Sequence, residues 1–386
     1  MVSVKTRTVK EIKYIYVSAT ASYKGERKSF EKMVGRKGTD ESLLADRIKF
    51  YSDLMSLKAD LFKMYLEIKA TKLDHLDKKC AIFLVLLPSF YRKYLSNLYP
   101  SELEKYKNNF DIRYIHNTNA IEGNTISLKE TAMMLDYNLS PRSKKLREIH
   151  EIENFTKVLN YVRKYDKGIN KKFMLKLHEL ITRNIDDNTA GNFRRISIGI
   201  SGSKWEPVPA ISVIEELDEL LKWYKGGANK INPFELAGIF NHRFLQIHPF
   251  VDGNGRVARE LFNFILQKNG FPPIIVPVKR RDDYMDYLEK ADEGDIRPLL
   301  RFYFQLLVTD YIMVVSEVFC QEQERFSGSL KNVDEGEISG SELMEYFDIL
   351  RWFFGLLGEL YEGGEMFGEM GDLMNALMTN GNISLN

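Results

Sequence analysis

The stretch HPFVDGNGRVAR, residues 248–259, gathers residue types that together can act on a phosphate ester. His248 is a candidate general base, because an imidazole changes its protonation state near neutral pH. Asp252 follows four residues later and is a candidate metal ligand. Arg256 and Arg259 come after a glycine-rich turn, and guanidinium groups bind phosphate oxygens well. The stretch therefore supplies a base, a metal ligand and an anion site.

The glycine-rich turn is predicted to lie at the start of a helix. Apolar residues recur at helical spacing both before His248 and after Gly255, and Pro249 separates the two runs. Free N–H groups and the helix dipole at such a start favour an anion. Gly253 and Gly255 let the backbone approach a phosphate, and Asn254 offers an amide donor and tolerates a left-handed conformation.

The two arginines lie one turn apart on the same side of the predicted helix, which favours a polyphosphate over a single phosphate. Asp252 would repel that anion unless a cation lay between them, and Mg²⁺ suits one carboxylate plus phosphate oxygens. With His248 placed to accept a proton, the pattern predicts metal-assisted transfer of a phosphorus group to a hydroxyl. A rival interpretation, a hydrolytic metal site of His242, His248 and Asp252, leaves the arginines without a role and ranks second.

The elements around this stretch are predicted to be mainly α-helical. Residues 9–37 alternate like a small β unit with a turn at YKGERK, and residues 38–73 have the spacing of one long helix or two. Further helices are expected at 101–118, 127–136, 146–165, 170–184, 211–225, 232–247, 255–269, 281–292 and 296–320. Residues 191–210 break this pattern and predict a β-hairpin whose free edge can pair with an extended peptide.

These patterns divide the chain into four segments. They are a small N-terminal β unit (1–40), a helical region (41–145), a catalytic core (146–320) and an acidic helical extension (321–386). From residue 326 onward the chain holds 11 acidic and two basic residues. Within this extension, Ser339 and Glu342 form a capping-box pattern ahead of an apolar helix. We expect that helix to dock on the body or to serve self-association, which leaves a homodimer open.

Composition narrows the class of protein. The 386 residues are 44% hydrophobic and 28% charged, with a net charge of +1. Because the last part is acidic, the rest of the chain is basic, which suits phosphate-rich ligands. No finger, RNA-binding signature or arginine tract points to nucleic acid. Two cysteines fit a reducing cytosol, and the absence of an apolar signal core predicts a soluble, cytoplasmic protein without membrane association.

The stretch 248–259 is similar to the HxFx(D/E)GNGRxxR signature of the Fic (filamentation-induced-by-cAMP) family and matches it at every fixed position. The similarity extends over roughly residues 105 to 310. It implies an all-α core with a β-hairpin flap, and transfer of AMP from ATP to a hydroxyl side chain of a target protein.

The resemblance assigns roles to residues of the stretch. It implies that His248 is the general base for a target Ser, Thr or Tyr and that Asp252 holds Mg²⁺ against the α- and β-phosphates. Phe250 would anchor the loop in the core. The resemblance further implies that the anion cradle and the arginines that contact the phosphates are Gly253, Asn254, Gly255, Arg256 and, at the γ-phosphate, Arg259.

Residues outside the stretch also receive roles from the resemblance. Tyr284 would line the adenine pocket, and Asp292 would lie near the adenine base. The flap that registers the target by strand pairing would comprise Ile198, Gly199, Ile200 and Ser201.

A second motif is similar to the inhibitory pattern of the same family. TNAIEGN, residues 118–124, matches [S/T]xxxE[G/N] and lies upstream of the core. It implies the class with an N-terminal inhibitory helix, in which Glu122 pairs with Arg259 and takes the guanidinium that would hold the γ-phosphate. In some relatives the same glutamate positions water for removal of AMP, so both activities and self-modification are expected.

Two other functional classes stay open at this point. The chain can be a Fic-type transferase or hydrolase that uses another nucleotide. It can also be a catalytically idle module whose partner docks on the predicted hairpin or on the acidic extension.

Overall fold

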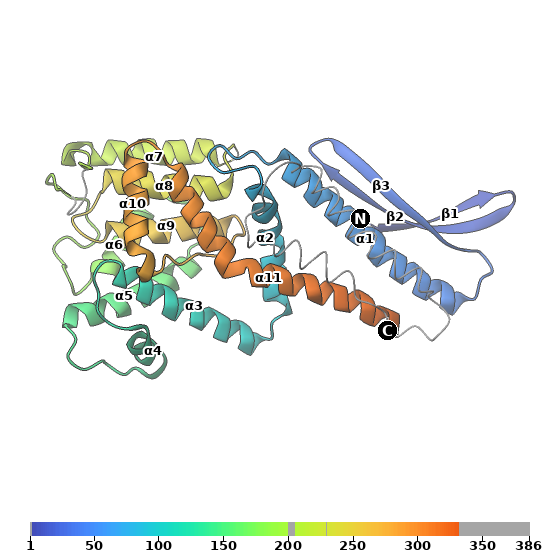
Figure 1. Cartoon of the computed structure of the whole chain (residues 1–386), viewed down its shortest axis with the longest axis horizontal. Helices are drawn as coiled ribbons and strands as arrows, with labels where there is room; N and C mark the ends of the chain where they lie inside the picture. Colours follow the sequence, from blue (N-terminus) through green and yellow to red (C-terminus); the bar gives the residue numbers. More distant parts are fainter. Residues whose placement is uncertain (1, 200–204, 229, 332–386) are drawn as a thin grey trace. The chain divides into compact units, whose positions relative to one another are not determined.

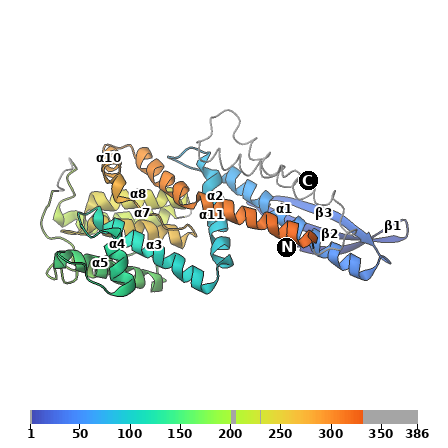
Figure 2. The same cartoon turned by 60° about the horizontal axis from the view of Figure 1, so that its bottom comes forward.

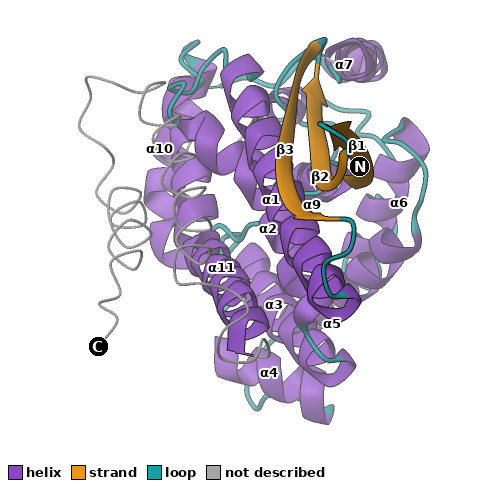
Figure 3. Cartoon of the chain, turned by 90° about the vertical axis from the view of Figure 1, so that its right-hand side faces the viewer, coloured by secondary structure: helices purple, strands orange, loops and turns teal. Residues whose placement is uncertain are grey.

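A three-stranded antiparallel sheet forms the N-terminal part of the chain, in the order β1 (Val2–Val9), β2 (Ile12–Tyr23) and β3 (Glu26–Arg36). The computed structural model describes residues 2–199, 205–228 and 230–331. Short apolar side chains alternate along β2, so that Val17, Ala19 and Ala21 are buried. The buried face packs on the single long helix α1 (Glu41–Ala70), as Figures 1 and 3 show.

The predicted β unit is confirmed, and it contains one strand more than the sequence pattern indicated. β1 has the sequence VSVKTRTV and pairs with β2 over its whole length, from Val2 opposite Ala19 to Val9 opposite Ile12. Most of β1 is exposed, so it lacks the apolar alternation that reveals a half-buried strand.

The remaining helices are α2 (Cys80–Asn97), α3 (Pro100–Ala120), α4 (Leu128–Tyr137), α5 (Leu146–Lys164), α6 (Lys171–Thr182), α7 (Val213–Gly227), α8 (Pro233–Ile247), α9 (Asn254–Lys268), α10 (Arg281–Asp292) and α11 (Arg297–Lys331). Nine of them lie where the sequence predicts them, to within a few residues at most ends. The exception is α2, which was not predicted. It continues through Pro88, a residue that normally interrupts a helix.

The described residues form two compact units. One comprises the sheet and α1, residues 81–86 and the described residues from Ile312 onward; the other comprises residues 72–80 and 87–311. These units divide the chain differently from the four segments expected from sequence, because α1 packs with the sheet and because α3 and α5 share a unit with α8 and α9. The capping-box pattern at Ser339 and most of the acidic extension lie outside the described residues.

Helix α9 occupies the interior of the larger unit and positions the loop that precedes it. It packs on α8, α6 and α3 (Figure 1), and α3 in turn runs beside α4 and α5 (Figure 2). Val257, Leu261 and Ile265 of α9 are fully buried. Burying each such side chain contributes roughly 1.5–3 kcal/mol, so the start of α9 is held in place by its own apolar face.

The predicted hairpin can be compared with the structure on both sides of its tip. The described residues there, 191–199 and 205–209, contain no strand, so the strand pairing of the flap is not seen in them.

One helix is apolar enough to be compared with a membrane span. In α11, Arg297–Val315 is long and apolar enough to cross a membrane, yet 56% of that window is buried. A core helix of a soluble protein passes the same test, so this segment is weak grounds for a membrane span.

Candidate active site

Helix α8 ends at Ile247, and the residue that caps it, His248, begins the predicted catalytic stretch. His248 has φ 50° and ψ 60°, and its N–H donates to the carbonyl of Phe244 at 3.0 Å. The proline that follows disfavours a helical conformation at His248 and ends the helix there. The chain therefore turns sharply at the histidine, and its side chain is half-buried.

The hydrogen bond of the His248 ring determines which nitrogen can act as a base. Nδ1 lies 3.2 Å from the carbonyl oxygen of Leu245. A carbonyl oxygen only accepts, so Nδ1 carries the hydrogen, and in the neutral ring Nε2 keeps a lone pair. Burial lowers the pKa of His248 below its ordinary value, and the charge of Arg194 acts in the same direction. At neutral pH the ring is an unprotonated base.

Arg194 connects the loop after α8, at His248 and Pro249, to residues on both sides of the predicted flap, and no sequence pattern revealed it. Its Nε donates to the His248 carbonyl at 2.8 Å, and Nη1 donates to the Ile196 carbonyl at 2.9 Å. Nη2 donates to the carbonyl of Val208, and the backbone N–H of Arg194 donates to Pro249 at 2.9 Å. Ile196 and Val208 lie on either side of residues 200–204 in the sequence, so this buried side chain holds the described residues on both sides to the loop after α8.

His178 on α6 packs against the loop between α8 and α9, and it too was not predicted from the sequence. Its ring stacks on Phe250, with 3.9 Å between the ring centres and 4° between the ring planes. Nδ1 accepts from the Gly191 N–H at 3.1 Å, so Nε2 carries the hydrogen and donates to the Asp252 carbonyl at 3.1 Å. Burial lowers the pKa of His178 to about 4, so this histidine is neutral and structural.

Asn254 closes the loop instead of facing an anion with its side chain. Its Oδ1 accepts from the Phe250 N–H at 2.9 Å, and its Nδ2 donates to the Phe250 carbonyl at 2.8 Å. The prediction that the Asn254 amide is offered to an anion does not hold in this structure, and the left-handed conformation that Asn254 could tolerate is not used there. The left-handed residues are His248 and Gly253, which has φ 80°. The predicted anchoring role of Phe250 agrees with its complete burial.

The start of α9 presents free N–H groups, as the sequence predicts. The backbone N–H groups of Asn254, Gly255 and Arg256 have no hydrogen-bond partner among the described residues. The Gly253 N–H is taken by the Asp252 carboxylate at 2.6 Å. Free N–H groups at a helix start attract an anion, and here they meet no side-chain cap.

Arg256 lies beneath this helix start, almost completely buried. Its guanidinium is 3.4 Å from carboxylate oxygens of Glu151 on α5 and of Asp252. Nε and Nη1 make no hydrogen bond with the described residues. A buried guanidinium with unsatisfied donors adds positive charge below the N–H groups, although it has no exposed surface for direct contact with a phosphate.

Asp252 is half-exposed and ionised. Burial raises the pKa of its carboxyl, but Arg256, the Gly253 N–H and Arg147 outweigh burial and lower the pKa below its usual value. Arg147 on α5 donates to Oδ2 at 2.7 Å, a contact that the sequence did not reveal. A single ionised carboxylate beside a phosphate site fits one ligand of Mg²⁺, provided that Arg147 turns away.

The rival metal site is contradicted by the position of His242. Its Nε2 lies 2.8 Å from Oδ1 of Asp292, a carboxylate oxygen that also accepts from Gln246 at 3.3 Å. Among the described residues no three His, Cys, Asp or Glu side chains are placed to hold a metal ion together. Asp292, predicted to lie near the base, is thus bound to two side chains of α8.

Tyr284, the other residue assigned to the adenine pocket, lies inside the core. Its side chain is buried, stacks on Phe302, and places its hydroxyl 3.4 Å from that of Tyr303. It has no exposed ring surface for an adenine in this structure. Of the predicted flap residues, Ile198 is half-buried and Gly199 is exposed, whereas Ile200 and Ser201 lie outside the described residues.

Arg259 and the predicted inhibitory glutamate meet across helices α3 and α9. Nη2 of Arg259 donates to Oε1 of Glu122 at 2.8 Å and to the Thr118 carbonyl at 2.7 Å. Its Nε donates to the Thr118 hydroxyl at 2.9 Å. A Cβ at Gly255 would overlap Oε1 of Glu122, so the glycine permits this close approach. The first and fifth residues of the TNAIEGN motif thus bind the last residue of the signature.

The sequence around the site is similar to known proteins. Residues 168–266 match the Fic/DOC family. The chain is 32% identical over 235 residues to protein adenylyltransferase fic-1 of Caenorhabditis briggsae, covering 59% of the chain and 44% of that protein. It is 34% identical over 201 residues to protein adenylyltransferase Fic of Culex quinquefasciatus, covering 50% of the chain and 39% of that protein. The chain thus spans less than half the length of these relatives.

Solved structures show the same fold. Fic-1 (residues 134–508) of Caenorhabditis elegans superposes with a TM-score of 0.51 at 26% identity, covering 76% of this chain and 78% of that one. A Fic-domain signaling protein from Bacteroides thetaiotaomicron gives a TM-score of 0.55 at 23% identity, covering 60% and 96%. The predicted mainly helical Fic fold is confirmed.

Proposed function

We propose that this chain, whose residues 168–266 match the Fic/DOC family, is an autoinhibited protein adenylyltransferase. It would transfer AMP from ATP to a Ser, Thr or Tyr hydroxyl of a target protein or of itself. The observation that carries this proposal is the pairing of a base with an anion site. His248 keeps a free Nε2 lone pair, and three unpaired N–H groups begin the helix that follows its loop.

In the proposed reaction His248 accepts the proton of the target hydroxyl at Nε2. The hydroxyl oxygen then attacks the α-phosphorus of ATP and forms a new P–O bond. The bond between that phosphorus and the bridging oxygen to the β-phosphate breaks, and pyrophosphate leaves with the electron pair. The lowered pKa of His248 keeps the base unprotonated at neutral pH.

Binding of ATP would use the start of α9. The free N–H groups of Asn254, Gly255 and Arg256 would receive phosphate oxygens, with the buried Arg256 charge beneath them. Arg259 would reach the γ-phosphate once Glu122 releases it. Asp252 would hold Mg²⁺, which when bound neutralises charge on the phosphates.

Inhibition would follow from the ion pair between Glu122 and Arg259. The guanidinium is 5% exposed, and its Nε and Nη2 are bonded to Thr118 and Glu122. A γ-phosphate would meet a carboxylate where it needs a cation, and like charges this close repel strongly at a partly buried site. ATP would then bind in a position from which the α-phosphorus is out of reach.

The target segment would lie along the flap, with Arg194 holding the ends of that segment against the catalytic loop. Ile198 and Gly199 would contribute backbone groups to strand pairing with an extended target segment.

Removal of AMP is a second candidate activity, and one observation favours it. Only Oε1 of Glu122 is hydrogen-bonded among the described residues, and the side chain is 31% exposed. The second carboxylate oxygen can therefore orient a water molecule toward an AMP ester.

Labelled nucleotides test these assignments. Wild type and Glu122→Gly are incubated with Mg²⁺ and labelled ATP, UTP or GTP, and label on protein is measured. Label from ATP alone, higher in the variant, supports the proposal. Label from another nucleotide points to the alternative transferase, and no nucleotide binding by calorimetry points to an idle interaction module.

A further inference from the structure

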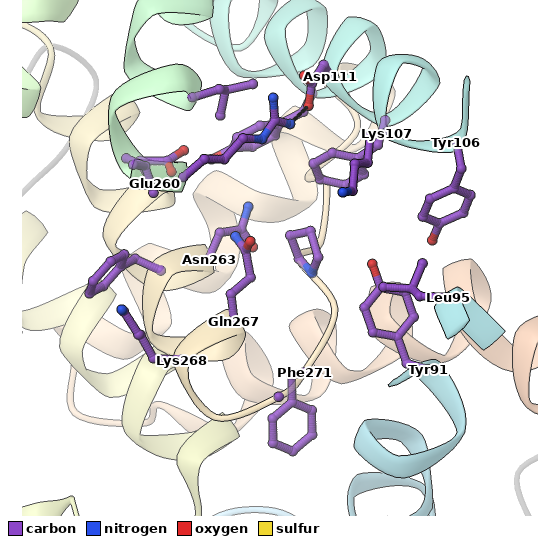
Figure 4. Close-up of a pocket in the computed structure, with 18 of the residues that line it drawn as sticks. Tyr91, Leu95, Tyr106, Lys107, Asp111, Glu260, Asn263, Gln267, Lys268 and Phe271 are labelled. Atoms are coloured by element: carbon purple, nitrogen blue, oxygen red, sulfur yellow. Dashed lines mark hydrogen bonds and ion pairs between the residues drawn. The ribbon is translucent and has the colours of Figure 1, made fainter. Parts of the chain in front are cut away.

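A cavity of about 700 Å³ lies in the larger unit. It is bordered by α2, α3, α5 and α9 and by the turn after α9 (Figure 4). None of its lining residues belongs to the candidate active site. In Figure 4 Glu260 lies on one side of the cavity and Tyr91 and Tyr106 on the other.

Aromatic side chains from α2, α3 and α9, and from the residue that follows α5, make up much of the wall. Phe110 and Tyr114 stack on α3, with ring centres 5.6 Å apart, and Tyr165 lies 6.0 Å from Phe264 of α9. A wall of this kind favours a flat apolar body, because aromatic faces stack on flat ligands and bury large areas.

Glu260 lines this cavity with a buried carboxyl, one oxygen of which has no hydrogen-bond partner among the described residues. The residue is 1% exposed, and its Oε2 makes no hydrogen bond with the described residues. The Tyr114 hydroxyl is buried close enough to lower the pKa of this carboxyl, but it makes no hydrogen bond of normal geometry with the described residues. A buried polar group left unpaired destabilises the folded protein, and burial raises the pKa of Glu260 to about 7. Protonated or ionised, a carboxyl oxygen can still accept, so a ligand with a hydrogen-bond donor would relieve this cost.

The exposed residues that line the cavity are mainly basic. Arg92, Lys107 and Lys268 are exposed, and Arg163 is paired with Asp111 at 2.5 Å. Apart from Glu260, Asp111 is the only acidic residue in the described lining, and that ion pair neutralises it. The opening therefore favours a negatively charged group.

We infer that this cavity binds a flat aromatic organic acid. Its ring N–H or O–H donates to Oε2 of Glu260, its ring packs among the tyrosines and phenylalanines, and its acid group faces Lys107 and Lys268.

Three probes of similar size separate the parts of this inference. Indole-3-propionate has a ring N–H and a negative charge, naphthalene-1-propionate lacks the donor, and tryptamine has the opposite charge. Calorimetry with the full chain should give a Kd for indole-3-propionate at least tenfold lower than for the other two. Glu260→Leu removes the acceptor and should weaken indole-3-propionate at least tenfold, whereas Glu260→Gln keeps an acceptor oxygen and should retain most of the affinity.

Lys268→Glu tests the opening without disturbing the core, because the side chain is exposed. It should weaken indole-3-propionate about fivefold, while Lys222→Ala on α7, outside the lining, should leave its Kd unchanged. The inference is overturned if indole-3-propionate does not bind, if all three probes bind equally, or if neither Lys268→Glu nor a folded Glu260→Leu weakens binding.

Discussion

Arg259 on α9 donates from Nη2 to Oε1 of Glu122 at 2.8 Å, 137 residues away in the chain. The same arginine donates to the hydroxyl and the carbonyl of Thr118, one turn before the glutamate on the same stretch. The arginine that we propose for the γ-phosphate is therefore already bonded to a carboxylate. If this contact keeps the arginine from a γ-phosphate, it should remove any preference for ATP over ADP.

We predict that wild-type protein binds ATP and ADP with similar affinity, and that Glu122→Gln binds ATP about tenfold more tightly than ADP. The amide has no charge, so the guanidinium becomes available to the γ-phosphate, and one charge-assisted hydrogen bond accounts for roughly 1.5–3 kcal/mol. Calorimetry with both nucleotides measures this difference. Glu153→Gln on α5 is the matched control and should behave as wild type; the same ATP preference in all three proteins would contradict the prediction.

The pH dependence of transfer should report His248. The base must be unprotonated, and burial places the pKa of His248 below the ordinary 6.5. The kcat/KM of Glu122→Gly should therefore be flat from pH 8 to about 6.5 and should fall as the pH drops through the lowered pKa. A decline that begins between pH 8 and 7 would argue against a buried, neutral base. His248→Asn should lose nearly all transfer and keep nucleotide affinity within about threefold.

Arg147→Ala should lower the Mg²⁺ concentration needed for half-maximal transfer by roughly two- to fivefold. Arg147 occupies Oδ2 of Asp252 at 2.7 Å, so a cation must displace it, and an exposed ion pair of this kind contributes up to about 1 kcal/mol. Titration of Mg²⁺ in the Glu122→Gly background measures the change. Arg113→Ala, an arginine of similar exposure that pairs with Asp310, should leave the Mg²⁺ requirement as it was.

His178 should make folding stability depend on pH. Its pKa is about 4 in the folded chain and near 6.5 when unfolded, so only the unfolded state takes up a proton between these values. The free energy of unfolding should therefore fall as the pH decreases from 6.5 to 4, by up to about 3 kcal/mol. His178→Asn is less stable at pH 7 but lacks this proton uptake. Its Tm should approach that of wild type at pH 4.5; a constant difference in Tm would refute the assignment.

Much of the site could be predicted because its residues are close in sequence. The order of base, carboxylate, glycines and arginines within residues 248–259 is enough to place a turn at a helix start, and that turn is where the structure has it. The role of the Asn254 side chain could not be predicted from its neighbours in sequence, because a tight loop must first satisfy the hydrogen bonds of its own backbone. Both polar atoms of that side chain are used by Phe250.

The supporting residues could not be found in the same way. Arg194, His178 and Arg147 are each more than 50 residues from the loop atoms that they contact. An arginine that donates to carbonyls, or a histidine that bonds to the backbone, follows no local spacing. Only the fold brings such residues to the loop. The exposed strand β1 and the proline-containing helix α2 were missed for the related reason that tertiary packing, and not local pattern, decides them.

Mass spectrometry of the Glu122→Gly chain after incubation with Mg²⁺ and ATP tests the central claim most directly. The account predicts that this variant gains the mass of AMP on a Ser, Thr or Tyr of itself or of an added protein, that wild type gains far less, and that the double variant Glu122→Gly/His248→Ala gains none. Equal AMP in wild type and Glu122→Gly, or undiminished AMP in the double variant, would contradict it.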